Sequence, residues 1–387
     1  MSVATAETSN QRLALERADT RPRNITSPAA QGASSPGITT HAAGTSGCAQ
    51  QSRLSTGANE ATAAPLSIDL SPFDQILRKT KAVALGRYRC TTDQPGFRAG
   101  GGPHRCAYVV FRRTSVRLHI GVGPTEVVTP NHVSFHNPGE SYSRTAISAE
   151  GEDCDWIALS PAFAREILRR GGRNSNPLPD WRLFAQPIAT MRPHLFIAQR
   201  QLFAAVRLQP GAWNSQQVDN AVAKLVACLV ADAATAPSQR WRKRRHPRPT
   251  CHQRQVQMIE EAKAILGRDF SADISLVELA RQLHCSPANL SRIFHAATGL
   301  RLNDYRLELR LRKGVALLEE SGFSIGDIGV QVGFASHSHF TSAFHQHFGM
   351  NPSQFLRARP ERLEALIPQP QVIERRDVSS YLSGAAA

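Results

Sequence analysis

Two helix-turn-helix patterns in the last third of the chain constrain its fold more than any other feature. In the second pattern, Ser324 precedes a short apolar stripe, Gly333 suits a tight turn, and Ser336 precedes a longer amphipathic stretch. Serine is a favoured helix N-cap, and glycine takes the positive φ of a tight turn without steric cost. The longer stretch carries aromatic residues at four-residue intervals, which share one face of a helix: Phe340, Phe344 and Phe348.

The first pattern has the same layout. Leucines stripe the segment from Leu276 to Leu283, Ser286 follows as an N-cap, and Pro287 takes the first helical position, where a missing N–H costs nothing. The next helix is expected to bury Leu290, Ile293, Phe294 and Ala297. Between the two patterns, Asn303 to Glu320 is predicted to form one helix. At roughly 1.5 Å per residue it is about 25 Å long, comparable with the ~34 Å of one DNA turn.

Small polar side chains occupy the outer face of the second helix in each pattern. They are Ala288, Asn289, Ser291, Arg292 and His295 in the first unit, and His337, Ser338, Thr341, Ser342 and His345 in the second. This layout is typical of a helix that reads the major groove of DNA. Arg292 is the strongest candidate, because an arginine can donate two hydrogen bonds to one guanine. The alternative is an ordinary solvated helix face.

A spine of residues runs through both patterns and the helix between them. It comprises Leu290, Arg292, Phe294, Thr298, Gly299, Tyr305, Arg310, Leu317, Leu318, Ser324, Ile325, Ile328, Gly333, Phe334, Ser338, His339, Phe340, Phe344, Phe348, Gly349 and Pro352. With this spine, residues 258–359 resemble the AraC/XylS family of bacterial transcription regulators. Two positions depart from the family: Ser342 stands where many members carry arginine, and Gly314 replaces a usual alanine inside the long helix. Glycine inside a helix costs roughly 0.5 to 1 kcal/mol relative to alanine.

Charge supports a polyanionic partner, since the 387 residues carry a formal net charge of +15. Residues 1–65 are rich in small and polar residues and are predicted to be a disordered tail. The sequence shows neither an eighteen-residue apolar run nor the apolar core of a signal peptide, so we expect no membrane partner and a cytoplasmic location.

The segment from residue 66 to 236 is predicted as a sensor domain. Short β-branched runs broken by Gly and Pro indicate a small antiparallel barrel, and amphipathic helices follow from Pro161. The family resemblance implies a cupin-like barrel that binds a small-molecule effector and helps form a homodimer. The aromatic residues Tyr108, Phe111, Phe135, Tyr142 and Trp156 are the candidate effector contacts. The alternative is that each is simply part of the core.

The expected fold class is α+β: an N-terminal cupin-like antiparallel β-barrel with flanking helices, then an all-α domain of two helix-turn-helix units joined by a long helix. A basic, proline-containing linker is placed at 237–254, the DNA-binding domain at 255–360 and a tail at 361–387. Pro247 and Pro249 are expected to keep the linker non-helical, and its cations to attract phosphates.

Neither a metal nor another cofactor is expected. Metal candidates are His119, His132, His136 and Glu140, or Cys90, His104, Cys106 and Cys154, but neither set has a recognisable ligand spacing. We therefore expect a sequence-specific transcription regulator rather than an enzyme, by family likeness an activator that also contacts RNA polymerase. Two alternatives remain: a DNA-modifying or repair enzyme with the same reading unit, and an architectural binder without sequence preference.

Overall fold

The computed structural model describes residues 66–94, 97, 101–170, 182–235, 249–320, 322–358 and 367. The predicted tails at 1–65 and 361–387 lie outside these residues, except for the buried Ile367, as does the linker up to residue 248. Strands β1 to β8 come first and helices follow, with the short strand β9 between α1 and α2, in agreement with the α+β prediction.

The described strands are β1 (Asp74–Lys79), β2 (Val83–Cys90), β3 (Ala107–Arg112), β4 (Val116–Ile120), β5 (Glu126–Val128), β6 (His132–His136), β7 (Tyr142–Ala146), β8 (Glu152–Leu159) and β9 (Ile188–Thr190). The described helices are α1 (Pro161–Arg170), α2 (Pro193–Leu208), α3 (Ser215–Thr235), α5 (Pro249–Arg268), α6 (Leu276–Gln282), α7 (Pro287–Thr298), α8 (Leu302–Glu320), α9 (Ile325–Gln331), α10 (His337–Phe348) and α11 (Pro352–Arg357). Among these helices, none has the length and apolar character needed to cross a bilayer.

The strands form two antiparallel sheets instead of one closed barrel. The larger has the order β1-β2-β8-β3-β6-β9 and the smaller the order β5-β4-β7. The second edge of β6 pairs with β9, with Val133 opposite Ala189, so it is not available to β4 or β5. The closed cupin-like barrel expected from the sequence is therefore corrected to two separate antiparallel sheets in the described part of the chain.

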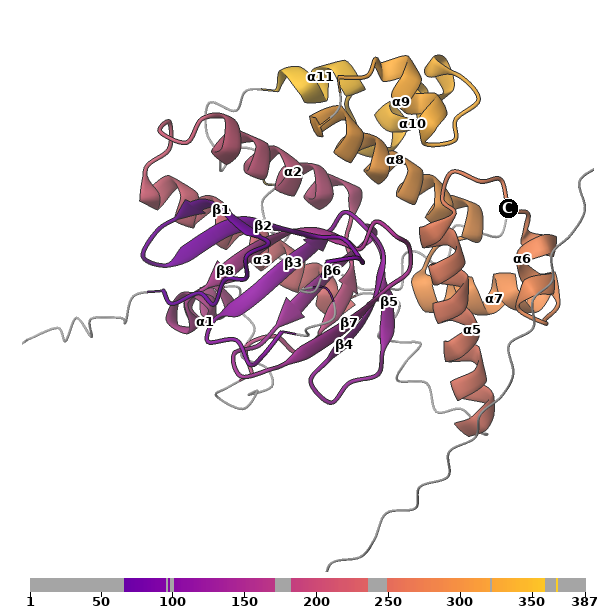
Figure 1. Ribbon diagram of the computed structural model, residues 1–387, viewed down its shortest axis with the longest axis horizontal. Helices are drawn as coiled ribbons and strands as arrows, with labels where there is room; N and C mark the ends of the chain where they lie inside the picture. Colours follow the sequence, from indigo (N-terminus) through magenta and orange to yellow (C-terminus); the bar gives the residue numbers. More distant parts are fainter. Residues whose placement is uncertain are drawn as a thin grey trace, which may run out of the picture. The chain divides into compact units, whose positions relative to one another are not determined.

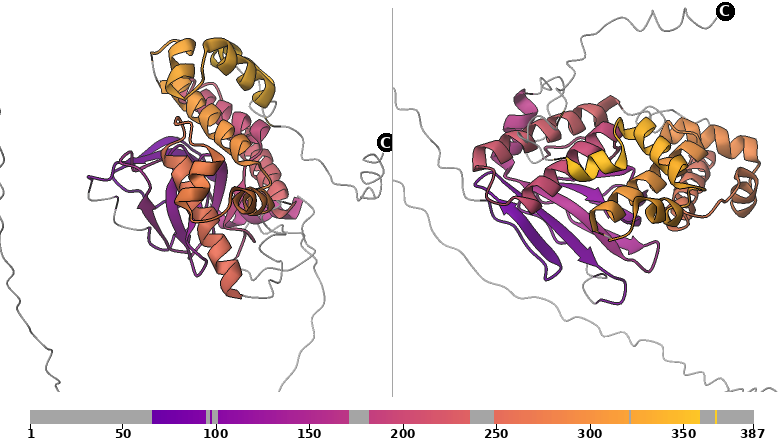
Figure 2. Two further views of the ribbon diagram at one scale, coloured as in Figure 1. Left: turned by 90° about the vertical axis from the view of Figure 1, so that its right-hand side faces the viewer. Right: turned by 90° about the horizontal axis from the view of Figure 1, so that it is seen from above.

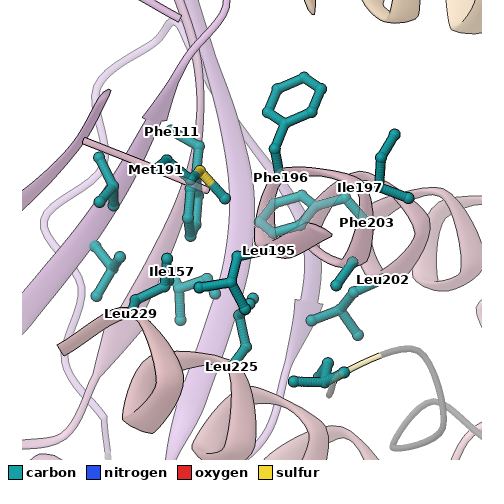
Figure 3. Packing of buried hydrophobic residues seen from close by; sticks show 14 of the residues in the cluster. Phe111, Ile157, Met191, Leu195, Phe196, Ile197, Leu202, Phe203, Leu225 and Leu229 are labelled. Carbon is teal, nitrogen blue, oxygen red and sulfur yellow. The ribbon is translucent and has the colours of Figure 1, made fainter. Parts of the chain in front are cut away.

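One face of the larger sheet packs on α2 and α3. Figure 2 shows these helices, in pink, lying over one side of the purple strands. Along β3, Ala107, Val109 and Phe111 belong to this core, where Phe111 meets Phe203 of α2 with ring centroids 6.1 Å apart. Figure 3 shows the same core, with Phe111 and Ile157 on the sheet side and residues of α2 and α3 opposite. Because side chains alternate along a strand, the intervening residues of β3 face the other way.

The helical half is arranged around α8. Figure 1 shows α6 and α7 at one end of α8 and α9 and α10 at the other. Ser286 and Ser336 cap α7 and α10, with their hydroxyl oxygens accepting hydrogen bonds from the backbone N–H three residues on, at 3.3 and 3.1 Å. Both helices end at a glycine with positive φ, Gly299 and Gly349. The predicted long helix is present, beginning one residue earlier at Leu302.

Glycines explain how the second unit packs. Gly333 has a φ of +90°, as its predicted turn requires. A Cβ at Gly314 would lie 3.0 Å from Cε2 of Phe340, so glycine at this position lets the aromatic stripe of α10 approach α8 closely. The first unit turns in the same way but without glycine, because His284 takes a positive φ of 51° at the corresponding position.

The linker prediction needs one correction. It extended to residue 254, but α5 begins at Pro249, so residues 249–254 are helical. Proline is tolerated at the first position of a helix because its missing N–H would have no partner there. Pro249 therefore begins α5, although prolines were expected to keep this segment non-helical.

Candidate DNA-binding surface and ligand pocket

The predicted reading face of α7 is accessible. Ala288, Ser291, Arg292 and His295 are exposed and Asn289 is half-buried, while the apolar stripe of the same helix is buried. Nη2 of Arg292 donates a hydrogen bond to Oδ1 of Asn289, at 2.9 Å. This contact lies on the surface and orients both polar groups outward, an arrangement that can address base edges or phosphates.

The predicted reading face of α10 has the same layout but no cation of its own. His337, Ser338, Ser342 and His345 are exposed, and Thr341 is half-buried, with its hydroxyl 3.4 Å from Nε2 of His337. The sequence has no Lys or Arg between Lys313 and Arg357. Any phosphate contact from α10 therefore rests on hydroxyls, histidines and the helix N-terminus.

A cavity of about 460 Å³ opens on the face of the larger sheet opposite α2 and α3. Three of the five candidate effector residues line it: Tyr108, Tyr142 and Trp156. Phe111 and Phe135 do not, because both point into the core on the other face, where Phe135 packs on Phe184. Strand alternation is the reason that Tyr108 and Phe111 of β3 face opposite sides of the larger sheet.

Two glycines leave space for two of the aromatic side chains that line the cavity, Trp156 and Tyr142. A Cβ at Gly86 would lie 2.1 Å from the ring of Trp156, and a Cβ at Gly101 would lie 2.0 Å from the ring of Tyr142. Nε1 of Trp156 donates to Oδ1 of Asp74 at 2.9 Å, which fixes the indole along the pocket wall.

Three charged side chains that the sequence analysis did not select are buried in this pocket. Arg112 and Arg144 both form ion pairs with Glu152, the latter at 2.5 Å between Nε and Oε2, and all three side chains are at most 3% exposed. The signal was present in the sequence: Arg112 has the same strand parity as Tyr108, and an arginine inside an apolar run faces either solvent or a buried partner.

Burial favours the uncharged forms of the histidine, cysteine and tyrosine side chains that line the cavity. Burial lowers the pKa of His104, opposed by Asp69 and Asp74, and burial together with Arg112 holds the pKa of His136 well below its usual value. Burial raises the pKa of the Cys154 thiol to about 12. Burial likewise raises the pKa of Tyr108.

Neither set of metal candidates is assembled into a group of three possible ligands in the described part of the chain. Within the described ranges, no three His, Cys, Asp or Glu side chains come together as a metal site would require. His132 instead lies 3.1 Å from the hydroxyl of Thr129, and Nε2 of His136 lies 3.3 Å from the hydroxyl of Ser134.

A buried ionic network joins the sheet to the end of α8. Arg113 contacts Asp155 at 3.1 Å and Glu320 at 2.6 Å. Arg200 of α2 contacts the same Asp155 at 2.8 Å and also pairs with Glu319. Burial raises the pKa of Asp155, but Arg113 and Arg200 outweigh it and lower the pKa overall, so the carboxylate stays charged.

Arg312, in the middle of α8, also contacts residues of the strand-bearing half of the chain. Its Nη1 donates to the carbonyl oxygen of Pro130 at 3.1 Å, and its guanidinium lies 4.7 Å above the ring of Phe196. The hydroxyls of Tyr305 and Thr129 lie 2.8 Å apart. The helix between the two reading units is therefore bonded to the sheets along most of its length.

Comparison with known proteins identifies relatives of the helical half. Residues 279–358 match the family model described as a helix-turn-helix domain. The Msm operon regulatory protein of Streptococcus mutans is 31% identical over 97 residues, which are 25% of this chain and 35% of that protein. The transcriptional activator RhaR of Pectobacterium carotovorum is 26% identical over 201 residues, 52% of this chain and 62% of its own. The chain thus spans less than two thirds of either relative.

Several solved structures are similar to this chain, and one of them covers part of it. It is a transcriptional regulator of Chromobacterium violaceum described as containing an AraC-type DNA-binding domain. It is 31% identical and covers 27% of this chain and 95% of that chain, with a TM-score of 0.26.

Proposed function

We propose that the chain is a sequence-specific DNA-binding transcription regulator of the AraC type, because residues 279–358 match a helix-turn-helix family model and the similar proteins are named as an operon regulatory protein and a transcriptional activator. The observation that carries this proposal is the pair of serine-capped helices, α7 and α10, placed at the two ends of α8 with polar outer faces exposed. Two readers joined by one helix can address two neighbouring major-groove segments.

The reading residues follow from the same geometry. Arg292, supported by Asn289, is the principal contact of α7, and His337, Ser338 and Ser342 present the smaller polar face of α10. The first unit therefore contributes more of the base discrimination than the second, because only α7 carries an arginine in its reading face.

The sensor half is assigned the binding of a small-molecule effector in the 460 Å³ cavity. The ionic network from the larger sheet to Glu319 and Glu320 supports this, because it connects the pocket-bearing strands to the helix that carries both readers. Activation through RNA polymerase and homodimerisation are parts of the same proposal, the latter to be checked by sedimentation.

Selection of DNA sites from a random pool at near-physiological salt tests the proposal. We expect an enriched motif with two boxes about one helical turn apart. Arg292→Ala should lower affinity for that motif by roughly 1 to 3 kcal/mol and relax base preference in one box. The control is Arg165→Ala, at an exposed position of α1 in the sensor half.

Two other results would contradict the proposal. Equal recovery of all sequences, with a salt dependence that accounts for nearly all the binding energy, would indicate an architectural binder. Conversion of modified DNA by the purified protein would indicate the enzymatic alternative.

A further inference from the structure

We propose that the cavity binds a small organic monoanion, a carboxylate on an aromatic or apolar body, with the carboxylate seated at Arg112. This inference rests on the proposed function in so far as the ligand would be the effector of a DNA-binding regulator. It adds the chemical class of the ligand and the residue that recognises its charge.

Buried charge is the first observation. Arg112, Arg144 and Glu152 all line the cavity and all are nearly inaccessible to solvent, so two cations share one carboxylate. The trio carries a formal charge of +1. A surplus buried charge is costly unless a counter-charge accompanies it, and a bound carboxylate would supply that charge.

Unsatisfied polar atoms are the second observation. Among the described residues, Nε of Arg112 and Nδ1 of His136 are buried and lack a hydrogen-bond partner. Both residues line the cavity. Leaving a buried polar group unpaired costs free energy, so these two atoms mark where ligand oxygens would gain most.

The walls define the body of the ligand. Trp156 and Tyr108 meet edge to face with centroids 5.9 Å apart, and the rings of His104 and Tyr142 stack at 5.4 Å. Val110 completes the apolar lining between them. Flat aromatic surfaces of this kind suit an aromatic or extended apolar group.

Two acidic residues of the lining favour a ligand with one negative charge. Asp69 and Asp74 line the cavity, and the charge of each raises the pKa of His104 and of Tyr108. A second carboxylate directed toward these residues would meet like charge. A monocarboxylate places its apolar end there instead.

The test uses probes of one shape and different charge, with binding to the full chain measured by calorimetry without DNA. The probes are 2-naphthoate, neutral 2-naphthamide, the cation 2-naphthylmethylammonium and 2,6-naphthalenedicarboxylate. We expect 2-naphthoate to bind at least about tenfold more tightly than each of the others, because only it makes a charge-assisted hydrogen bond without placing a second carboxylate near Asp69 and Asp74. Equal affinities, preference for the cation or dianion, or no detectable binding of 2-naphthoate at millimolar concentration would each overturn the proposal.

Two substitutions of opposite sign separate recognition from a folding defect. Arg112→Gln should weaken 2-naphthoate binding by at least about tenfold, whereas Glu152→Gln should strengthen it, because it removes the competing carboxylate. A general loss of folding would weaken both. The matched control is Arg117→Gln on β4, an arginine that does not line the cavity and pairs with Glu261 on the surface.

The outcome for the ligand is independent of the outcome for DNA. Loss of charge selectivity together with a recovered two-box DNA motif would overturn only this inference. Selective binding of 2-naphthoate without any DNA motif would instead count against the proposed regulator while leaving the pocket assignment standing.

Discussion

At the scale of single residues, His347 is the clearest source of pH dependence. It lies on the inner side of α10, where burial and, less strongly, Arg312 lower its pKa to about 4, although Oε1 of Glu308 is 4.0 Å from its Nε2. The unfolded chain binds a proton near pH 6.5 and the folded chain only near pH 4. Stability is therefore full above pH 6.5 and falls as the pH drops through this window.

We expect the free energy of unfolding to fall by roughly 1 to 2 kcal/mol from this residue between pH 7 and pH 5. His347→Gln should reduce the pH dependence by that amount. Chemical denaturation of both proteins at the two pH values measures it. An identical pH dependence in the variant would show that His347 is solvated in both states.

Gly86 is the second residue-scale prediction. Gly86→Ala would place a methyl group on the ring of Trp156 and should destabilise the protein by about 1 to 3 kcal/mol, as overpacking does. Trp156 would also lose its position in the cavity, so binding of 2-naphthoate should weaken. Gly211→Ala is the control, because nothing lies within 4 Å of a Cβ there. Thermal unfolding distinguishes the two, and equal stability of both variants would contradict the packing argument.

Residues three apart show what the sequence could and could not predict about the pocket. Tyr108 and Phe111 lie on one strand at opposite parity, so alternation alone separates them once β3 is recognised. It does not reveal which face holds the cavity, because both faces of β3 are buried. Arg112 could have been selected by parity with Tyr108, but its partner Glu152 is forty residues away and no local pattern joins them.

At the scale of elements, the network around the end of α8 gives the third prediction. Arg200→Met removes one of the two cations that Asp155 and Glu319 share, both carboxylates being at most 5% exposed, and leaves them with Arg113 as their remaining arginine partner. The expected loss is about 3 kcal/mol or more in the free energy of unfolding. Arg281→Met, at an exposed ion pair with Glu278, should leave the unfolding midpoint unchanged. Similar midpoints for the two variants would mean that the network is hydrated.

Helices were more predictable than sheets for a local reason. Each helix is specified by residues close together in the sequence, such as the N-caps Ser286 and Ser336 and the aromatic stripe of α10. The observed α7, α8 and α10 therefore agree closely with the predicted helices. The open arrangement of the sheets depends on β9 pairing with β6, more than fifty residues away in sequence. The length and composition of a strand do not predict which distant strand it pairs with.

At the scale of the whole molecule, the distribution of charge gives the fourth prediction. Arg240 to His252 carries six Lys or Arg residues and no acid. Replacing the six with glutamine should make the dependence of DNA affinity on log salt shallower, by about 0.9 for each phosphate that these cations neutralise. Titrations at several salt concentrations measure the slope. An unchanged slope would identify the segment as a solvated connection between the two halves.

The contacts between the strand-bearing half and the helical half could not be predicted from the sequence. Arg113 and Glu320 are separated by 207 positions, and Arg312 reaches the carbonyl of Pro130 across 182. Each is an ordinary charged residue in its own segment. Only the folded chain shows that they hold α8, the helix between the two helix-turn-helix units, against the strand-bearing half of the chain.

Strand β8 has a consequence for how this protein can change over evolution. Glu152, Cys154 and Trp156 face the cavity, and Asp153 and Asp155 face the ionic network, so one strand serves two purposes by alternation. Deleting a single residue near its start would exchange the two faces at once, turning acids toward the cavity and an indole toward α2. We therefore expect related proteins to have no insertions or deletions within β8. Changes in ligand preference should arise by substitution at the alternate positions of β8 that face the cavity, Glu152, Cys154 and Trp156.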